Sequence, residues 1–158
     1  MLQLNKINRR CRDCKEVKLF IFFDRTEKRR QCLKCKAAQA VHRVNRSPKS
    51  YIRNLVVQLR YSRKKQGHKW DVTKKEIYQL YLKQGGKCAL SGVEMTHVRT
   101  HDVKGDTNIS IDRIDPEGLY VLANIQLVCK RVNYMKHNKD QKTFLNWVGL
   151  IYNNSNND

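Results

Sequence analysis

Six cysteines are the residues whose spacing most directly indicates chemistry. Four of them form two Cys-x2-Cys pairs separated by 17 residues: Cys11, Cys14, Cys32 and Cys35. Each pair places two thiolates on one side of a tight turn, and two pairs complete the four-thiolate tetrahedron typical of structural Zn²⁺. A redox dithiol is the alternative, although it would need only one pair. The apolar run Leu19–Phe23 between the pairs predicts a short strand over the metal, and zinc would supply the folding energy of this small segment.

The positive charge of the chain is concentrated in its first half. The 158 residues carry a formal net charge of +19, and residues 1–87 hold 25 Lys and Arg against 6 Asp and Glu. Between Glu27 and Asp71 there are 14 Lys and Arg and no acidic residue. This imbalance argues against an ordinary metabolic enzyme and predicts a polyanionic partner, with a merely solubilising surface as the alternative. No apolar run is long enough to cross a membrane and no signal sequence is evident, so we expect a cytoplasmic protein.

The chain after Cys35 is expected to be helical to about Asn45, and two further helices are predicted within this basic region. Ser47 and Pro48 are a helix N-cap and first position, with apolar residues at helical spacing as far as Lys65. Thr73-x-x-Glu76 is a capping box that opens a second helix, Lys74 to about Gln84. We expect the basic residues of this region to contact double-stranded DNA: Arg43, Arg46, Lys49, Arg53, Arg60, Arg63, Lys64, Lys65 and Lys69.

The pattern changes after Lys87 and predicts an α+β segment. CALSGVEM is typical of a short hairpin, and Ile109–Ile114 alternates like a strand whose partner, after a turn at 115–118, is Leu119–Val121. Asn124 is expected to open a helix, and Asp140 to cap the last one. The prediction is three parts: a zinc-binding knuckle module (1–46), a basic helical DNA-binding region (47–86) and a small α+β domain (87–158).

Residues 110–136, SIDRIDPEGLYVLANIQLVCKRVNYMK, resemble the ββα-metal core of HNH (His-Me finger) endonucleases. Upstream, GGKCALSG is similar to that family's first knuckle, and the zinc module followed by a basic helix is similar to phage HNH, endonuclease VII-like and homing endonucleases. The resemblance implies an HNH-like ββα-metal nuclease domain. It further implies a phage-encoded protein that acts in the cytoplasm of an infected bacterium, and it leaves a homodimer open.

The resemblance also implies roles for particular residues. Asp112 and Asn133 would bind the catalytic divalent ion, because a carboxylate and an amide oxygen suit a hard ion such as Mg²⁺. Asn124 would hold the hairpin loop in shape, although a simple N-cap is the alternative. The position usually held by the general-base histidine is Arg113, which cannot accept a proton and would instead hold a phosphate oxygen.

The general base must therefore come from another residue. Three imidazoles are available, His97, His101 and His137, of which His101 is favoured because it lies in a loop before the predicted strand. Cys88 and Cys129 lack the second thiolate of each family knuckle, so we expect them to pack together as small apolar residues. A zinc site completed by His97 or His101 is the alternative.

Three functions follow from these observations. The first is a metal-dependent DNA endonuclease, in homing or in DNA processing. The second is a nucleic-acid-binding protein on a catalytically disabled HNH core, as Arg113 suggests. An adaptor for a larger complex is a third, which predicts little salt-sensitive affinity for nucleic acid.

Overall fold

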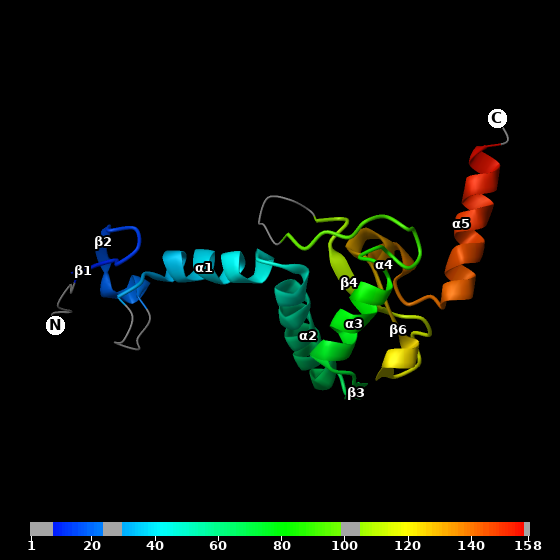
Figure 1. Cartoon of the computed structure of the whole chain (residues 1–158), viewed down its shortest axis with the longest axis horizontal. Coiled ribbons are helices and arrows are strands. Elements are labelled where there is room, and N and C mark those ends of the chain that lie inside the picture. The colour runs from blue at the N-terminus through cyan, green and yellow to red at the C-terminus, as the bar shows by residue number, and fades with distance from the viewer. Residues whose placement is uncertain (1–7, 24–29, 99–104, 157–158) are drawn as a thin grey trace, which may run out of the picture. The chain divides into compact units, whose positions relative to one another are not determined.

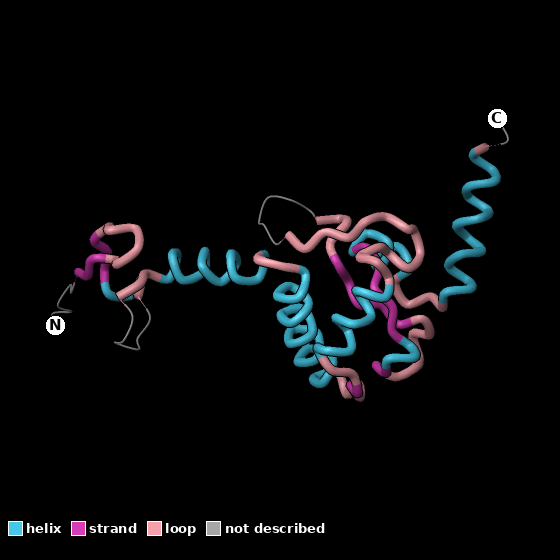
Figure 2. Tube along the Cα trace, in the orientation of Figure 1, coloured by secondary structure: helices cyan, strands magenta, loops and turns pink. Residues whose placement is uncertain are grey.

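The computed structural model describes residues 8–23, 30–98 and 105–156, which form two compact units, Met1–Val44 and Asn45–Asp158. Figure 1 shows the order of helices and strands along the chain, and Figure 2 distinguishes helices, strands and loops. Each unit has its own buried core. Within the described ranges, no helix has the length and apolar character that a membrane crossing requires.

The first unit is a cysteine knuckle followed by a helix. Strand β1 (Asn8–Arg10) pairs antiparallel with β2 (Val17–Leu19), and α1 covers Leu33–Asn45. The predicted strand Leu19–Phe23 is wrong beyond its first residue, because Phe20–Phe22 forms a 3-10 turn. Ile21 and Phe22 are exposed there, and Phe23 is the one residue of the apolar run that is buried in the core of this unit. That core consists of Cys11, Phe23 and Cys32, with Cys35 packed against it.

Two helices of the second unit begin where the sequence predicts. Helix α2 (Pro48–Lys65) is capped by the Ser47 hydroxyl, which accepts a hydrogen bond from Ser50 N, and has Pro48 in its first turn. Helix α3 (Lys74–Lys83) has the predicted capping box of Thr73 and Glu76. Both helices bury apolar side chains in the core of the second unit, which also contains residues from 109–111 and 125–129. The basic region 47–86 therefore packs together with residues from 87–158.

The central hairpin differs from the prediction. Strand β4 (Ile109–Arg113) pairs antiparallel with β6 (Ile125–Cys129), whereas the short β5 (Tyr120–Val121) pairs parallel with β3 (Trp70–Asp71). The expected pairing of 119–121 with β4 and the expected helix start at Asn124 are therefore wrong. All five residues of β6 are buried, four of them apolar and one, Gln126, polar, so burial does not follow a helical period here.

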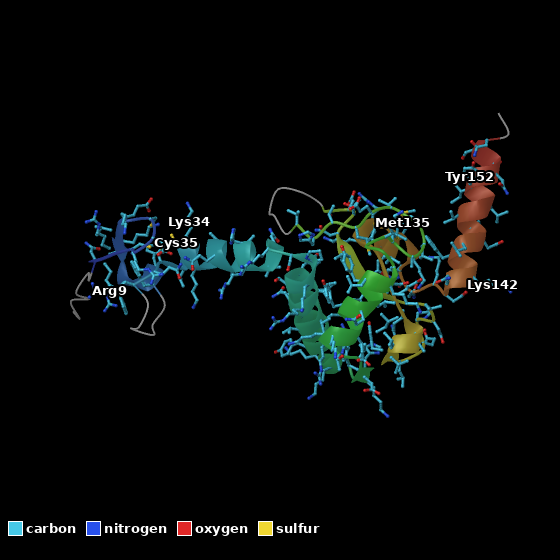
Figure 3. All side chains as sticks on the ribbon, in the orientation of Figure 1. Arg9, Lys34, Cys35, Met135, Lys142 and Tyr152 are labelled. Atoms are coloured by element: carbon cyan, nitrogen blue, oxygen red, sulfur yellow. The ribbon has the colours of Figure 1, made fainter. Side chains whose placement is uncertain are left out.

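The hairpin is followed by two helices, α4 (Lys130–Lys136) and α5 (Gln141–Ser155). Asp140 caps α5 as predicted, accepting a hydrogen bond from Thr143 N. The side chain of Phe144 is buried, whereas Tyr152 near the other end of α5 is exposed (Figure 3). The arrangement β4, β6, α4 is thus a ββα unit, with its second strand later in the sequence than expected.

Candidate active site and zinc centre

The four cysteines of the N-terminal unit converge on one point. Their sulfur atoms all lie within 4.8 Å of one another, and Cys14 Sγ is 4.0 Å from Cys32 Sγ. In a tetrahedral site with Zn–S bonds of about 2.3 Å, the sulfurs lie roughly 3.8 Å apart. The donor set and its spacing therefore fit a structural zinc ion, as the sequence predicts. Figure 3 shows Cys35 in this unit, beside Lys34.

The local hydrogen bonds favour thiolate at one ligand. Cys32 N donates to Cys11 Sγ at 3.3 Å, and this bond lowers the pKa of the Cys11 thiol to about 6. Hydrogen bonding with the Cys32 thiol, together with burial, raises the pKa of Cys35 to about 12. Thiolate is the form that binds zinc, so a bound cation would have to drive the deprotonation of Cys35.

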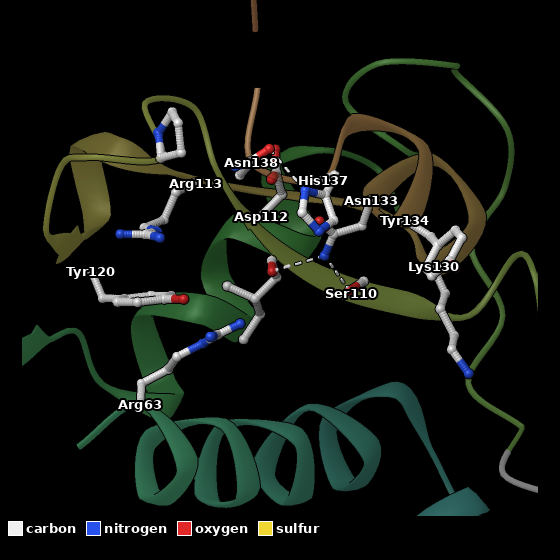
Figure 4. A pocket seen from close by; sticks show the side chains of 12 residues that line it. Arg63, Ser110, Asp112, Arg113, Tyr120, Lys130, Asn133, Tyr134, His137 and Asn138 are labelled. Atoms are coloured by element: carbon white, nitrogen blue, oxygen red, sulfur yellow. Dashed lines mark hydrogen bonds between the residues drawn. The ribbon is translucent and has the colours of Figure 1, made fainter. Parts of the chain in front are cut away.

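A second site is an open pocket of about 460 Å³ in the other unit (Figure 4). Its walls come from α2, the β4 strand, the turn after it and α4. The lining residues are Arg63, Ser110, Ile111, Asp112, Arg113, Pro116, Tyr120, Lys130, Asn133, Tyr134, His137 and Asn138. Asp112, Arg113 and Asn133, three of the predicted site residues, therefore lie in one cavity.

Asp112 is a buried carboxylate whose two oxygens each accept a hydrogen bond. Lys136 Nζ is 3.2 Å from Oδ1, and Gln126 Nε2 donates to Oδ2 at 2.9 Å. The lysine is fully buried and also donates to the Arg113 carbonyl at 2.7 Å. A carboxylate oxygen has two lone-pair sites, so these bonds leave acceptor capacity on Asp112 for a cation. The positive charge of Lys136, which lies against Oδ1, would oppose binding of that cation.

Asn133 is oriented by strand β4. Its Nδ2 donates to Ser110 Oγ at 2.7 Å and to the Ile111 carbonyl at 3.2 Å. Both amide hydrogens are thereby used on the strand, and Oδ1 has no hydrogen-bond donor within the described part of the chain. An amide oxygen and a carboxylate in one pocket are a donor set that suits a hard divalent cation.

The pocket is also rich in cationic groups. The Arg113 guanidinium donates to the Gly118 carbonyl at 2.9 Å and lies 4.7 Å from the centre of the Tyr120 ring. Tyr120 in turn stacks on Trp70 at 4.8 Å. In Figure 4 the Tyr120 ring lies between Arg113 and Arg63. Arg63 Nε is buried and has no partner among the described residues, so this guanidinium has capacity left for an anion.

Asn124 lies outside this pocket and holds the turn between β4 and β5. Its Oδ1 accepts from Asp115 N at 2.9 Å, and its Nδ2 donates to the carbonyls of Asp115 and Leu119 at 3.0 and 3.1 Å. The turn is packed closely, because a Cβ built on Gly118 would lie 2.5 Å from Asn124 Nδ2. Asn124 thus contacts the backbone of the turn, and it is not an N-cap.

The remaining predicted residues fall in different places. His101 lies outside the described residues, and the alternative base His97 does not line the pocket. Most of the predicted DNA-contacting cations are exposed: Arg43, Arg46, Lys49, Arg53, Arg60, Lys64, Lys65 and Lys69. Arg63 is the exception, since it is half-buried and points into the pocket. Lys136 and Gln126, which hold Asp112, were not predicted as site residues.

Cys88 and Cys129 are both buried in the core of the second unit. Burial raises the pKa of Cys129 to about 11. Burial also acts to raise the pKa of Cys88, but hydrogen bonds with Ser91 and the Cys129 backbone outweigh it and leave that pKa below its usual value. Among the described residues, no further cysteine, histidine or carboxylate joins the pair as a metal cluster.

Comparison with known proteins yielded one structural similarity. No protein-family model and no curated protein matches the chain. A solved structure of the rare-cutting HNH restriction endonuclease PacI is similar with a TM-score of 0.45 and 19% sequence identity, over 93% of this chain and 94% of that chain. A TM-score below 0.5 does not establish a common fold, and function has to be inferred from the residues of the pocket.

Proposed function

We propose that this protein is a metal-dependent endonuclease that hydrolyses phosphodiester bonds in double-stranded DNA. The observation that carries the proposal is that Asp112, Asn133 and two arginines line one open pocket. Phosphodiester hydrolysis requires oxygen ligands for a divalent ion and cations for the negative charge that develops on the phosphate. The resemblance to phage HNH proteins supports a role in homing or DNA processing in an infected bacterium.

Each group in the pocket has a role in this mechanism. Asp112 and the Asn133 amide oxygen would hold Mg²⁺ or another divalent ion, which when bound supplies Lewis-acid stabilisation of the scissile phosphate. Arg113 is held by Gly118 and Tyr120 and presents hydrogen-bond donors to a phosphate oxygen. Arg63 approaches the same space from α2. Arg113 cannot act as the base, because a guanidinium stays protonated.

DNA affinity is assigned to the exposed cations of α1 and α2. A protein that neutralises several phosphates loses affinity steeply with salt, with a slope of roughly 0.9 in log affinity per contact. The basic helices would place the duplex, and the pocket would cut it. The zinc centre would fold the first unit, whose core within residues 8–23 and 30–44 consists of Cys11, Phe23 and Cys32.

The test is nicking of supercoiled plasmid by purified protein with Mg²⁺ or Mn²⁺. We expect nicking by the wild type, none with excess chelator, and a loss of about 10²-fold or more in Asn133→Ala. Asn133→Asp keeps an oxygen ligand but loses the hydrogen bonds that its Nδ2 donates to strand β4, so it should retain only part of the activity. Asn146→Ala on α5 is the matched control and should cut normally. Full activity in Asn133→Ala would exclude the amide from the mechanism.

The second candidate is a nucleic-acid-binding protein on an inactive core. The observation that favours it is the pair of cations around Asp112: Arg113 replaces the usual base, and Lys136 already neutralises the carboxylate. Binding of DNA with a steep salt dependence, but no nicking under any divalent ion, would select this candidate over the first.

A further inference from the structure

His137 ends helix α4 in a backbone conformation that residues other than glycine rarely adopt. Its φ is 52° and its ψ is −122°. The left-handed helical region, which asparagine and a few other residues tolerate, has ψ near +30° to +60°, so His137 lies outside it. His137 is the first central residue of a type II′ turn closed by the Lys139 N–H and the Lys136 carbonyl at 3.1 Å, a position that favours glycine, so a histidine there costs free energy of folding.

The strained backbone places an imidazole in the pocket. His137 lines the same cavity as Asp112 and Asn133, as the close view in Figure 4 shows. It follows Asn133 by four residues, one helical turn, and its backbone N–H donates to the Asn133 carbonyl at 2.9 Å. Of the four histidines among the described residues, His137 alone lines this pocket.

The neighbouring side chain selects a tautomer. His137 Nδ1 is 2.8 Å from Asn138 Oδ1. An amide oxygen only accepts hydrogen bonds, so Nδ1 must carry the proton in this contact. The neutral ring then has its free lone pair on Nε2. A ring oriented by a hydrogen bond on one nitrogen, with the other nitrogen free, is the arrangement of a general base.

We propose that His137 is the proton acceptor for the attacking water, in place of the arginine that stands where HNH proteins usually have a histidine. The inference depends on the nuclease function proposed above. In the step, the oxygen of water forms a bond to phosphorus while its proton moves to His137 Nε2. The bond from phosphorus to the leaving sugar oxygen breaks, and a second water protonates that oxygen. The ring then returns its proton to solvent.

The experiment compares His137→Gly with His137→Ala and the wild type in two measurements, plasmid nicking and thermal unfolding. Glycine relieves the backbone strain, so His137→Gly should melt about 2–8 °C above the wild type, whereas His137→Ala should show no such rise. Both variants should lose about 10²- to 10⁴-fold in nicking rate, the usual contribution of a general base. Added imidazole should restore part of the rate in His137→Gly, because it can enter the vacated space.

His42→Ala, on α1 of the other unit, is the control and should nick normally without response to imidazole. Nicking by His137→Gly at the wild-type rate, a loss that imidazole does not restore, or a melting temperature below the wild type would each overturn the inference. A loss seen in His101→Ala and absent from His137→Gly would assign the base to His101 instead. If the wild type itself nicks under no divalent ion, the nuclease proposal fails; if it nicks and His137→Gly nicks equally, only the role of His137 fails.

Discussion

The buried ion pair between Lys136 and Asp112 makes the strongest prediction about stability. Lys136 Nζ is 3.2 Å from Asp112 Oδ1, and the two side chains are 1% and 4% exposed. At an effective dielectric of about 20, two charges at this distance attract by roughly 5 kcal/mol. Removing one partner leaves the other charge buried and uncompensated, which costs about 3–5 kcal/mol. We therefore expect Lys136→Met to destabilise the second unit by that amount.

The assay is urea unfolding of Lys136→Met against the wild type. Since a domain has only about 5–15 kcal/mol of stability, the loss should be obvious as a lower midpoint with a similar slope. The matched control is Lys139→Met, an exposed lysine beyond the helix, which should change stability by less than about 0.5 kcal/mol. The double variant Asp112→Asn/Lys136→Met should recover part of the loss, because no buried charge remains. A loss below about 1 kcal/mol in Lys136→Met would refute the reasoning.

Three further predictions concern other parts of the chain. Asn124→Ala removes three hydrogen bonds to the turn and should cost about 2–3 kcal/mol in urea unfolding, whereas Asn146→Ala should cost nearly nothing. Hydrogen bonds from the Thr73 hydroxyl and backbone N–H lower the pKa of Glu76, so the contribution of this carboxylate to stability is present above about pH 4.3 and lost as the pH falls further. Glu76→Gln should therefore flatten the profile of unfolding free energy against pH in that range. An unchanged profile would contradict a role of the capping box in stability. A chelator should release about one zinc ion per chain, measured by atomic absorption, and should unfold the first unit. The urea transition of the second unit should stay unchanged. Purified protein that contains no zinc would exclude a zinc site at the four cysteines.

The helix starts were predictable because their signals are local. Ser47 and Pro48 at one helix, and Thr73 with Glu76 at the other, satisfy free backbone groups within a single turn. The cysteine cluster was predictable for a similar reason, since the ligand spacing itself requires two tight turns. At the helix starts, and within each Cys-x2-Cys pair, the deciding residues are three positions apart, and the cluster then needs only that the two pairs meet.

The hairpin was not predictable from the same kind of signal. Residues 125–129 are apolar except for Gln126, and such a short run is compatible with a buried strand or with a helix. Its pairing with β4 is decided by packing against α3 and by hydrogen bonds from Gln84, whose Nε2 donates to the Leu127 carbonyl and whose Oε1 accepts from Leu127 N. Those contacts join residues 43 positions apart, so no local pattern shows them.

The pocket contains residues that the sequence predicted and residues that only the folded chain shows. Asp112 and Asn133 were identified by resemblance to a family motif, and the structure brings them into one cavity. The two residues that hold Asp112 were not identified, because a buried lysine has the same appearance in sequence as an exposed one. Lys136 is followed by His137, whose backbone strain is visible only in the folded chain.

In the proposed nuclease, binding and cutting are not separated along the sequence as its charge suggests, because Arg63 of the basic helix α2 lines the pocket. Helix α2 packs Ile52 and Val56 into the core beneath the hairpin, and this packing directs Arg63 into the pocket while Lys64 remains exposed. Neighbouring cations on one helix should therefore have different kinetic effects. Arg63→Met should lower kcat by about 10²- to 10³-fold, as loss of a donor to the reacting phosphate does, with little change in DNA affinity. Lys64→Met should weaken affinity and reduce the salt slope by about one contact, with kcat unchanged. Equal effects of the two substitutions on affinity alone would show that α2 only binds the duplex.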